Sequence, residues 1–126
     1  MKKGFSLVEI ILVLGLVIVI STAIIFLLNP SQQLAAARNN QRRAHVYSIL
    51  NSISQNIADN SGNFNCVSGV IPTATSTMAD NNPVVGDYNI APCLVPVYLQ
   101  SFPFDPASTT AQYLGVNDYY SGYVVK

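Results

Sequence analysis

Residues 4–28 read GFSLVEIILVLGLVIVISTAIIFLL, and this stretch sets the fold class of the chain. From Ile10 to Leu28 it is almost wholly apolar, interrupted by one glycine and two hydroxyl residues. About 20 apolar residues, at a rise of about 1.5 Å each, are enough to cross the hydrocarbon core of a bilayer. Lys2 and Lys3 precede the stretch, and basic residues favour the cytoplasmic side. The sequence therefore predicts one membrane-spanning helix whose C-terminal end faces outward.

Glu9 is an unusual residue for such a helix. A carboxylate in a membrane helix is costly, so it marks a functional site and requires a partner. No basic side chain lies between Gly4 and Ala37. Cleavage between Gly4 and Phe5 would create an α-amine, which is cationic at neutral pH. Glu9 is then expected to pair with the amine of its own Phe5, one helical turn away, or with that of a neighbouring molecule.

Residues 2–10, KKGFSLVEI, resemble the leader and cleavage site of type IV prepilins and type II secretion pseudopilins. A short basic leader, Gly4, Phe5 and Glu9 fall in register ahead of one long apolar run. The resemblance implies that a prepilin peptidase removes residues 1–4 and methylates the new N-terminus at Phe5. It also implies that Glu9 is the intersubunit partner of the Phe5 amine in a filament.

An ordinary secretory signal is the rival interpretation of the N-terminus. Such a signal would be cut after Ala23, within the sequence Ser21-Thr22-Ala23. Against it, Ile24–Leu28 continue the apolar run, and Glu9 is out of place in a signal core.

The helical pattern continues beyond the membrane segment. We expect residues 5–29 to form the transmembrane and filament-core helix, and residues 30–60 its amphipathic continuation. Pro30 removes a backbone donor and disfavours helix at Asn29, so it predicts either a kink or a break between two helices. The spacing of the apolar residues predicts that one face packs against the C-terminal domain. This face contains Val46, Leu50, Ile53 and Ile57, widened by Tyr47 and Ile49.

The polar residues of this second helical segment are expected to play no catalytic part. Arg38, Arg42 and Arg43 form either a solvated face or a set of partners for acidic groups of adjacent subunits. His45 has no ligand-spaced companions, so we interpret it as structural.

Residues 61–126 are expected to form a small globular domain. Its two cysteines, Cys66 and Cys93, favour a disulfide over a metal or redox site in an exported domain with a small core. Closing this loop would stabilise the fold by about 3 kcal/mol in the chain-entropy model. Two buried free thiols are the alternative. Residues 64–92 look like an irregular loop, in which residues 67–71 form a short strand or a helical turn.

The C-terminal third predicts an antiparallel sheet. Residues 98–106, YLQSFPFDP, are similar to a passage that leads into the sheet of pseudopilin-like and short pilin domains. Asp105 is expected to accept backbone hydrogen bonds in this turn. Residues 111–116 and 119–125 read as strands, with a bulge or tight turn at Ser121-Gly122. The residues expected to face the helix are Leu114, Val116, Tyr120 and Val124, or their neighbours. The fold class is therefore α+β, with a long N-terminal helix packed against a small antiparallel sheet.

Charge and motif content argue against an enzyme or a nucleic-acid-binding protein. Without residues 1–4 the chain has four basic and six acidic side chains, whereas nucleic-acid binding needs a basic face. No phosphate-binding loop, metal-ligand cluster or catalytic relay is apparent, and no cofactor is expected. The aspartates are too scattered for the oxygen-rich loop that calcium requires. These are Asp80, Asp87, Asp105 and Asp118.

The resemblance predicts a structural subunit of a type IV pilus-like filament. Its partners would be further copies of the chain, the membrane, the prepilin peptidase, and an inner-membrane assembly platform with a motor ATPase. It would begin as a single-pass protein of the cytoplasmic membrane and end in an extracellular pilus or a periplasm-spanning pseudopilus. Two alternatives remain: a pseudopilin of a type II secretion or competence system, and a monomeric membrane-anchored binding module.

Overall fold

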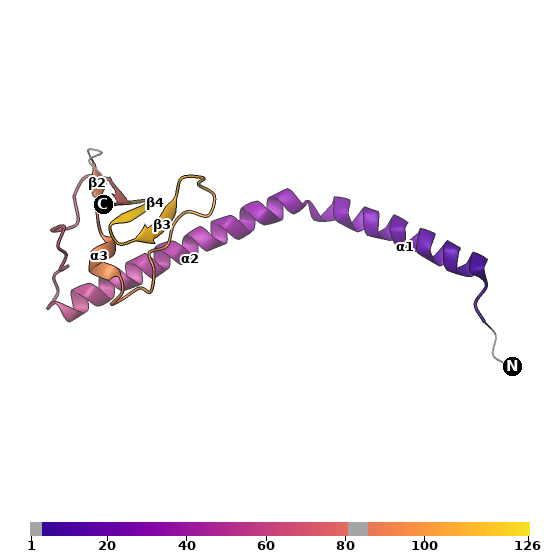
Figure 1. Cartoon of the computed structure of the whole chain (residues 1–126), viewed down its shortest axis with the longest axis horizontal. Helices are drawn as coiled ribbons and strands as arrows, with labels where there is room; N and C mark the ends of the chain where they lie inside the picture. The colour runs from indigo at the N-terminus through magenta and orange to yellow at the C-terminus, as the bar shows by residue number, and fades with distance from the viewer. Residues whose placement is uncertain (1–3, 81–85) are drawn as a thin grey trace. The chain divides into compact units, whose positions relative to one another are not determined.

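A computed structural model describes residues 4–80 and 86–126 (Figure 1). The chain divides into two compact units, the first ending at Ala37 and the second running from Arg38 to Lys126, and each is described by itself. Lys2 and Lys3 of the expected leader, and Pro83 of the expected loop, lie outside the described residues.

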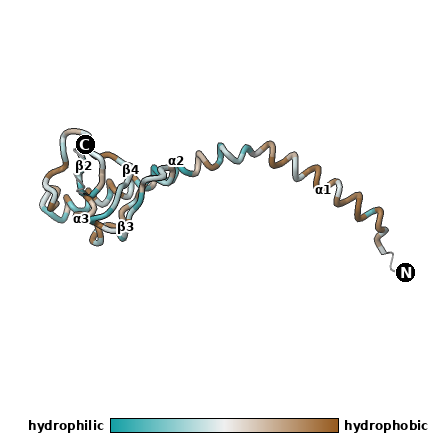
Figure 2. The backbone as a smooth tube through the Cα atoms, turned by 45° about the horizontal axis from the view of Figure 1, so that its top comes forward, coloured by the Kyte–Doolittle hydropathy of each residue, from teal (hydrophilic) through white to brown (hydrophobic). Residues whose placement is uncertain are grey.

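Helix α1 spans Leu7–Leu28 and is apolar along almost its whole length (Figure 2). Residues 7–27 of this helix are long and apolar enough to cross a membrane, and none of them is buried within the chain. Ser21 and Thr22 donate their hydroxyls to carbonyls four residues earlier, at 2.7 and 2.8 Å. These bonds leave no unpaired hydroxyl proton, so both residues are compatible with an apolar environment.

The helix is interrupted at Asn29, which adopts a left-handed conformation with φ of 41°. Helix α2 then begins at Pro30 and runs to Asp59. Proline suits the first helical position because its fixed φ is helical and the amide it lacks would have no partner there. The amides of Gln32 and Gln33 donate to the Asn29 carbonyl at 3.1 and 3.4 Å. The interruption thus lies at the two residues that the sequence pattern singles out.

The buried face of α2 matches the predicted one only in part, since Ile49 is buried and Ile53 packs against the core. Ile49, Ser52 and Asn56 are buried, whereas Val46 and Leu50 are 42% and 51% exposed. One residue along a helix is a rotation of about 100°. The predicted apolar stripe therefore lies partly on the surface, and the face that packs inward carries two polar side chains with hydrogen-bond partners of their own.

The second unit contains a four-stranded sheet of order β2-β1-β4-β3. β1 pairs parallel with β2 and antiparallel with β4, and β4 pairs antiparallel with β3. The expectation of a purely antiparallel sheet is therefore wrong, although the α+β class is confirmed. The strands are β1 (Ser76–Ala79), β2 (Asp87–Tyr88), β3 (Gln112–Gly115) and β4 (Asp118–Val125).

The parallel pair arises from the segment that was expected to be an irregular loop. β1 and β2 lie between residues 64 and 92, and the short helix α3 (Ala91–Leu94) begins there. β1 and β2 are brief, and their pairing involves the register Thr77 to Asp87 and Met78 to Tyr88. Such short strands next to glycine and proline give little periodic signal. Residues 67–71 form no strand, but Val67 and Ser68 lie in a turn closed by a hydrogen bond from the Gly69 amide to the Cys66 carbonyl at 3.0 Å.

The two C-terminal strands lie where the sequence predicts them, with a bulge at Ser121-Gly122. Between the paired positions Thr77–Val124 and Ala79–Tyr120, β4 contains two more residues than β1. Gly122 has φ of 75°, a conformation that glycine adopts without steric cost. The Ser121 hydroxyl donates to the Met78 carbonyl at 2.6 Å. This carbonyl therefore has a hydrogen-bond partner at the point where the bulge interrupts the regular pairing of β1 with β4.

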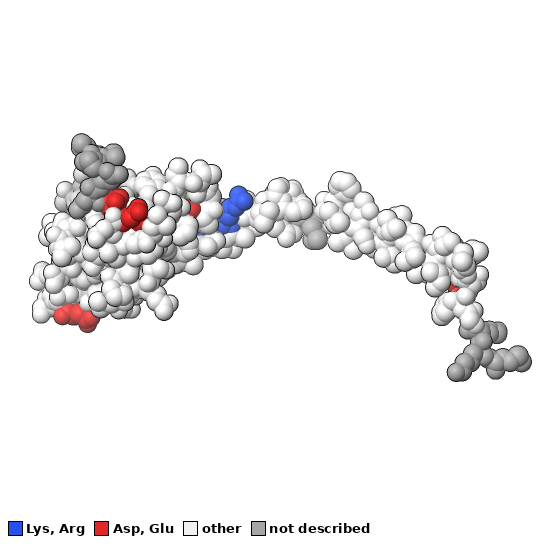
Figure 3. Space-filling model, in the orientation of Figure 1, with Lys and Arg blue, Asp and Glu red and all other residues white. Residues whose placement is uncertain are grey.

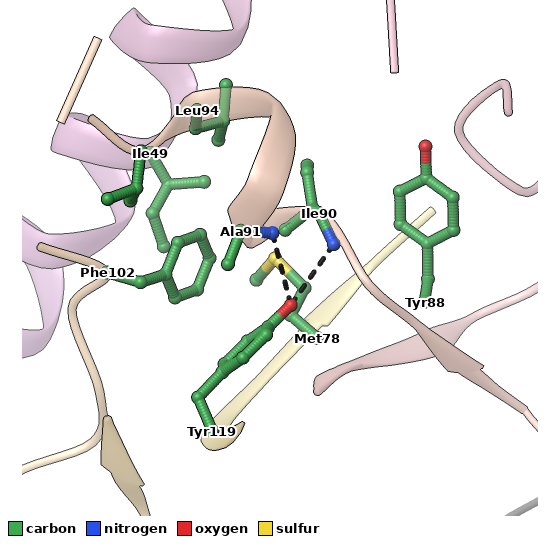
Figure 4. Close-up of a cluster of buried hydrophobic side chains, with 9 residues drawn as sticks. Ile49, Met78, Tyr88, Ile90, Ala91, Leu94, Phe102 and Tyr119 are labelled. Carbon is green, nitrogen blue, oxygen red and sulfur yellow. Dashed lines mark hydrogen bonds between the residues drawn. The ribbon is translucent and has the colours of Figure 1, made fainter. Parts of the chain in front are cut away.

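The core of the second unit is centred on Tyr119 of β4, whose hydroxyl accepts from the Ile90 and Ala91 amides at 3.1 and 3.2 Å (Figure 4). These bonds tie the start of α3 to the sheet. The ring of Phe102 packs 5.2 Å from that of Tyr119, measured between centroids. The other buried members of this cluster are Ile49, Met78, Tyr88, Leu94 and Val95.

Candidate functional site

The N-terminal end of α1 contains the residues of the expected processing and assembly site. Residues 4–6 precede the helix, and Ser6 is its N-cap, with an extended backbone. The Ser6 carbonyl accepts from the Glu9 and Ile10 amides at 3.0 and 3.2 Å. Phe5 is 78% exposed, and Gly4 before it is exposed as well, so among the described residues nothing covers the Gly4–Phe5 bond.

Glu9 lies in the first turn of α1, where a negative charge interacts favourably with the helix dipole. It is the one charged side chain between Leu7 and Leu28, and the face of α1 shown in Figure 3 is white apart from one small red area near its N-terminal end. Because the helix begins at Leu7, Phe5 is not stacked one helical turn before Glu9 in this uncleaved chain. The uncleaved chain has no amine at Phe5, so the pairing of Glu9 remains a prediction.

The second unit is cross-linked by a disulfide between Cys66 and Cys93, with Cα atoms 5.0 Å apart. Asn56 of α2 forms hydrogen bonds with the backbone beside this disulfide. Its side-chain oxygen accepts from the Asn65 amide at 2.9 Å, and its nitrogen donates to the carbonyls of Asn65 and Cys93 at 3.1 and 3.2 Å. Helix α2 is thereby held to both ends of the disulfide loop.

Arg42 and Asp105 form a bidentate ion pair between α2 and the turn that follows Pro103. Nε and Nη2 of Arg42 each donate to a different carboxylate oxygen at 2.8 Å. The Ala107 amide also donates to the Asp105 carboxylate, at 2.9 Å, as the sequence predicted for this turn. Hydrogen bonds from Arg42 and Ala107 lower the pKa of Asp105 below its usual value. Arg42 is therefore paired within the chain, although its side chain is still 41% exposed.

His45 and Tyr123 extend this contact between α2 and the C-terminal strand. His45 Nδ1 lies 3.0 Å from the Tyr123 hydroxyl, and the two rings meet edge to face. Burial raises the pKa of Tyr123 above its usual value. Burial also raises the pKa of Tyr119, to about 12, so its hydroxyl stays protonated throughout the physiological range. His45 and Tyr123 thus connect α2 to β4, and Tyr119 connects β4 to the start of α3, so we interpret these contacts as structural.

The remaining cationic side chains of α2 are placed differently from Arg42. Arg38 and Arg43 are exposed, and among the residues that the structure describes neither forms an ion pair. Within the same described ranges, no group of three or more His, Cys, Asp and Glu side chains has the proximity needed to hold a metal ion.

Sequence reasoning missed Asn56, Ser52 and the Arg42–Asp105 pair. The spacing of Ile49, Ser52 and Asn56 is itself helical, three and then four residues, so a pattern that admits polar residues would have found this face. The ion pair joins residues 63 positions apart, and no local pattern predicts such a contact.

No family model, curated protein or solved structure matches this chain.

Proposed function

We propose that this chain is a structural subunit of a type IV pilus-like filament that is assembled from the cytoplasmic membrane. The observation that carries the proposal is the position of Glu9, a single carboxylate in an apolar helix, four residues beyond a Gly4–Phe5 bond that is free of neighbouring structure. Cleavage at that bond supplies a cation where the helix otherwise has none.

The energetics of α1 are consistent with reversible storage in a membrane. Lipid tails and the apolar core of a helical bundle solvate leucine and isoleucine about equally well, so hydrophobic transfer alone does not drive assembly. Packing and the pairing of Glu9 with a Phe5 amine must then provide the register between subunits. Pairing also removes the cost of an isolated carboxylate in an apolar environment.

The second unit has the features of a small exported domain. Its disulfide suits an oxidising compartment, and the Asn56 and Arg42–Asp105 contacts tie its loop and turn to α2. Such a domain would be carried on the outside of the filament. A motor ATPase on the inner-membrane platform would supply the work of extraction, because nothing in this chain resembles a nucleotide-binding motif.

The proposal is tested by shearing filaments from the cell surface, imaging them by electron microscopy, and identifying their subunits by mass spectrometry. We expect this chain as the main component, and we expect the filaments to vanish when its gene is deleted. Recovery of the chain solely from membranes, with Lys2 and Lys3 still attached, would instead support a monomeric membrane-anchored binding module. Filaments that require secretin-dependent secretion genes would identify a pseudopilin.

A further inference from the structure

The second unit exposes two apolar patches, one on α2 and one on the sheet. The helix patch consists of Arg43, Val46, Tyr47 and Leu50, which recur at helical spacing on one side of α2. Tyr47 is 67% exposed and Leu50 51%. These side chains line an open surface hollow of about 460 Å³. Val46 and Leu50 also line a groove of about 340 Å³ that continues to Val124 at the end of β4.

The strand patch consists of Leu114, Asp118 and Tyr120 on β3 and β4. Tyr113 pairs with the buried Tyr119, and successive side chains of a strand point to opposite faces. Leu114, Asp118 and Tyr120 therefore point away from the core. Leu114 is 71% exposed, which is unusual for a leucine within a sheet whose other face is buried.

The two patches are complementary in charge. Arg43 belongs to the helix patch and Asp118 to the strand patch. Among the described residues neither side chain forms an ion pair. Asp118 lies on the face of the sheet opposite Tyr119, and Tyr119 shares the core with Ile49 of α2. Arg43 and Asp118 are not paired within one unit, so each is available to a second copy of the chain.

We infer that the helix patch of one subunit docks on the strand patch of the next, with Arg43 paired to Asp118. The inference rests on the proposed function and names a contact between the globular units of neighbouring subunits. Because the two patches differ, the contact is heterologous, and a heterologous contact that does not close into a ring propagates into a filament. The patches are smaller than a standard stable interface, so the contact acts together with those of α1.

Site-directed cross-linking tests the pairing in cells that express the full chain. We would introduce Tyr47→Cys and Leu114→Cys, singly and together, and treat the cells with a short flexible bis-maleimide. Cys66 and Cys93 are joined in a disulfide, so the introduced thiols are the ones that react. The double variant should give a ladder of dimers, trimers and longer species on denaturing gels. Each single variant should remain monomeric.

Two results would overturn the pairing. Dimers from Tyr47→Cys alone would mean that two helix patches face each other across a twofold axis. Absence of cross-linked species from the double variant would mean that the patches do not meet. In that second case, sheared filaments that still contain the chain would leave the proposed function standing, whereas a subunit that stays monomeric in the membrane would contradict both.

Charge exchange provides a second measurement on the same double-cysteine chain. Arg43→Glu should lower the ladder yield several-fold, and adding Asp118→Lys should restore it. Arg38→Glu is the matched control, because Arg38 is an exposed arginine on the same helix outside the helix patch. An equal loss with Arg38→Glu, or no recovery in the charge-exchanged chain, would contradict a specific pair between Arg43 and Asp118.

Discussion

In the proposed filament Glu9 would meet two physical requirements, because its charge would have to be tolerated in the membrane and then neutralised in the filament. Glu9→Ala makes α1 more apolar, so insertion should persist, and the Gly4–Phe5 bond remains available for cleavage. The Phe5 amine would lose its partner among apolar helices. Leaving one member of a buried ion pair unpaired costs about 3–5 kcal/mol. We expect the yield of sheared filaments to fall at least about tenfold, with cleaved subunit accumulating in the membrane.

The matched control for Glu9→Ala is Thr22→Val, which removes a polar group from the same helix. The Thr22 hydroxyl bonds to a carbonyl of its own helix, so its loss should leave the filament yield unchanged. Glu9→Gln separates charge from size, and it should fail as Glu9→Ala does. Normal filament yield from Glu9→Gln in cells without other pilins would show that the charge has no role in assembly.

Asp105 should contribute to stability in a pH-dependent manner. Its lowered pKa means that the ionised carboxylate is favoured in the folded state. The contribution is therefore fully present above the ordinary carboxyl pKa of about 4, and is lost as the pH falls through the lowered value. We expect Asp105→Asn to lower the thermal midpoint of the full chain in detergent by a few degrees at pH 7.

The difference between wild type and Asp105→Asn should shrink toward zero in strong acid, as measured by near-ultraviolet circular dichroism of the tyrosines. Asp118→Asn is the control, because Asp118 is an exposed aspartate with no ion pair among the described residues. A difference that stayed constant from neutral to acidic pH would mean that the Arg42–Asp105 pair is not its source.

At the level of elements, the disulfide loop should depend on its cross-link for stability. Cys66 and Cys93 are 27 positions apart, and closing a loop of this length restricts the unfolded chain by about 3 kcal/mol. We expect the double variant Cys66→Ser/Cys93→Ser to lose a similar free energy of unfolding in urea. A reductant should bring the wild type to the same value and leave the variant unchanged. Alkylation of both cysteines in freshly isolated, unreduced protein would contradict the cross-link.

The elements also show how far sequence reasoning reaches. The N-terminal helix and the strands near residues 112–115 and 118–125 were predictable, because each has a strong local pattern. The inward face of α2 was predictable only in part, because Ile49 belongs to the apolar pattern whereas the buried Ser52 and Asn56 do not. Burial of these two polar side chains is favourable because each forms a hydrogen bond, Ser52 to the Ser48 carbonyl of its own helix and Asn56 to the distant Cys93 carbonyl.

The parallel pairing of β1 with β2 was likewise beyond local patterns. Both strands are short, and a parallel pair depends on a connection that brings two segments side by side. Tyr119 illustrates the same limit. Its aromatic character favours a strand, but its role as acceptor for the Ile90 and Ala91 amides depends on a fold already formed.

As a whole molecule, the proposed filament subunit exists in two states, first as an uncut membrane protein and then as a cut filament subunit. The N-terminal residue distinguishes the two states, because it is Met1 before cleavage and Phe5 after it. Replacing Gly4 with a bulky residue should hold the chain in the first state, because the expected cleavage site has a small residue before the cut.

Cleavage before Phe5 and the pairing of its amine with Glu9 are therefore best tested by the terminal sequence and mass of the subunit in sheared filaments. We predict that the filament subunit begins at Phe5, carries one methyl group on its α-amine, and lacks Lys2 and Lys3. A filament subunit that retained Met1, or that began at Ile24, would have no amine positioned to pair with Glu9, and would contradict the account.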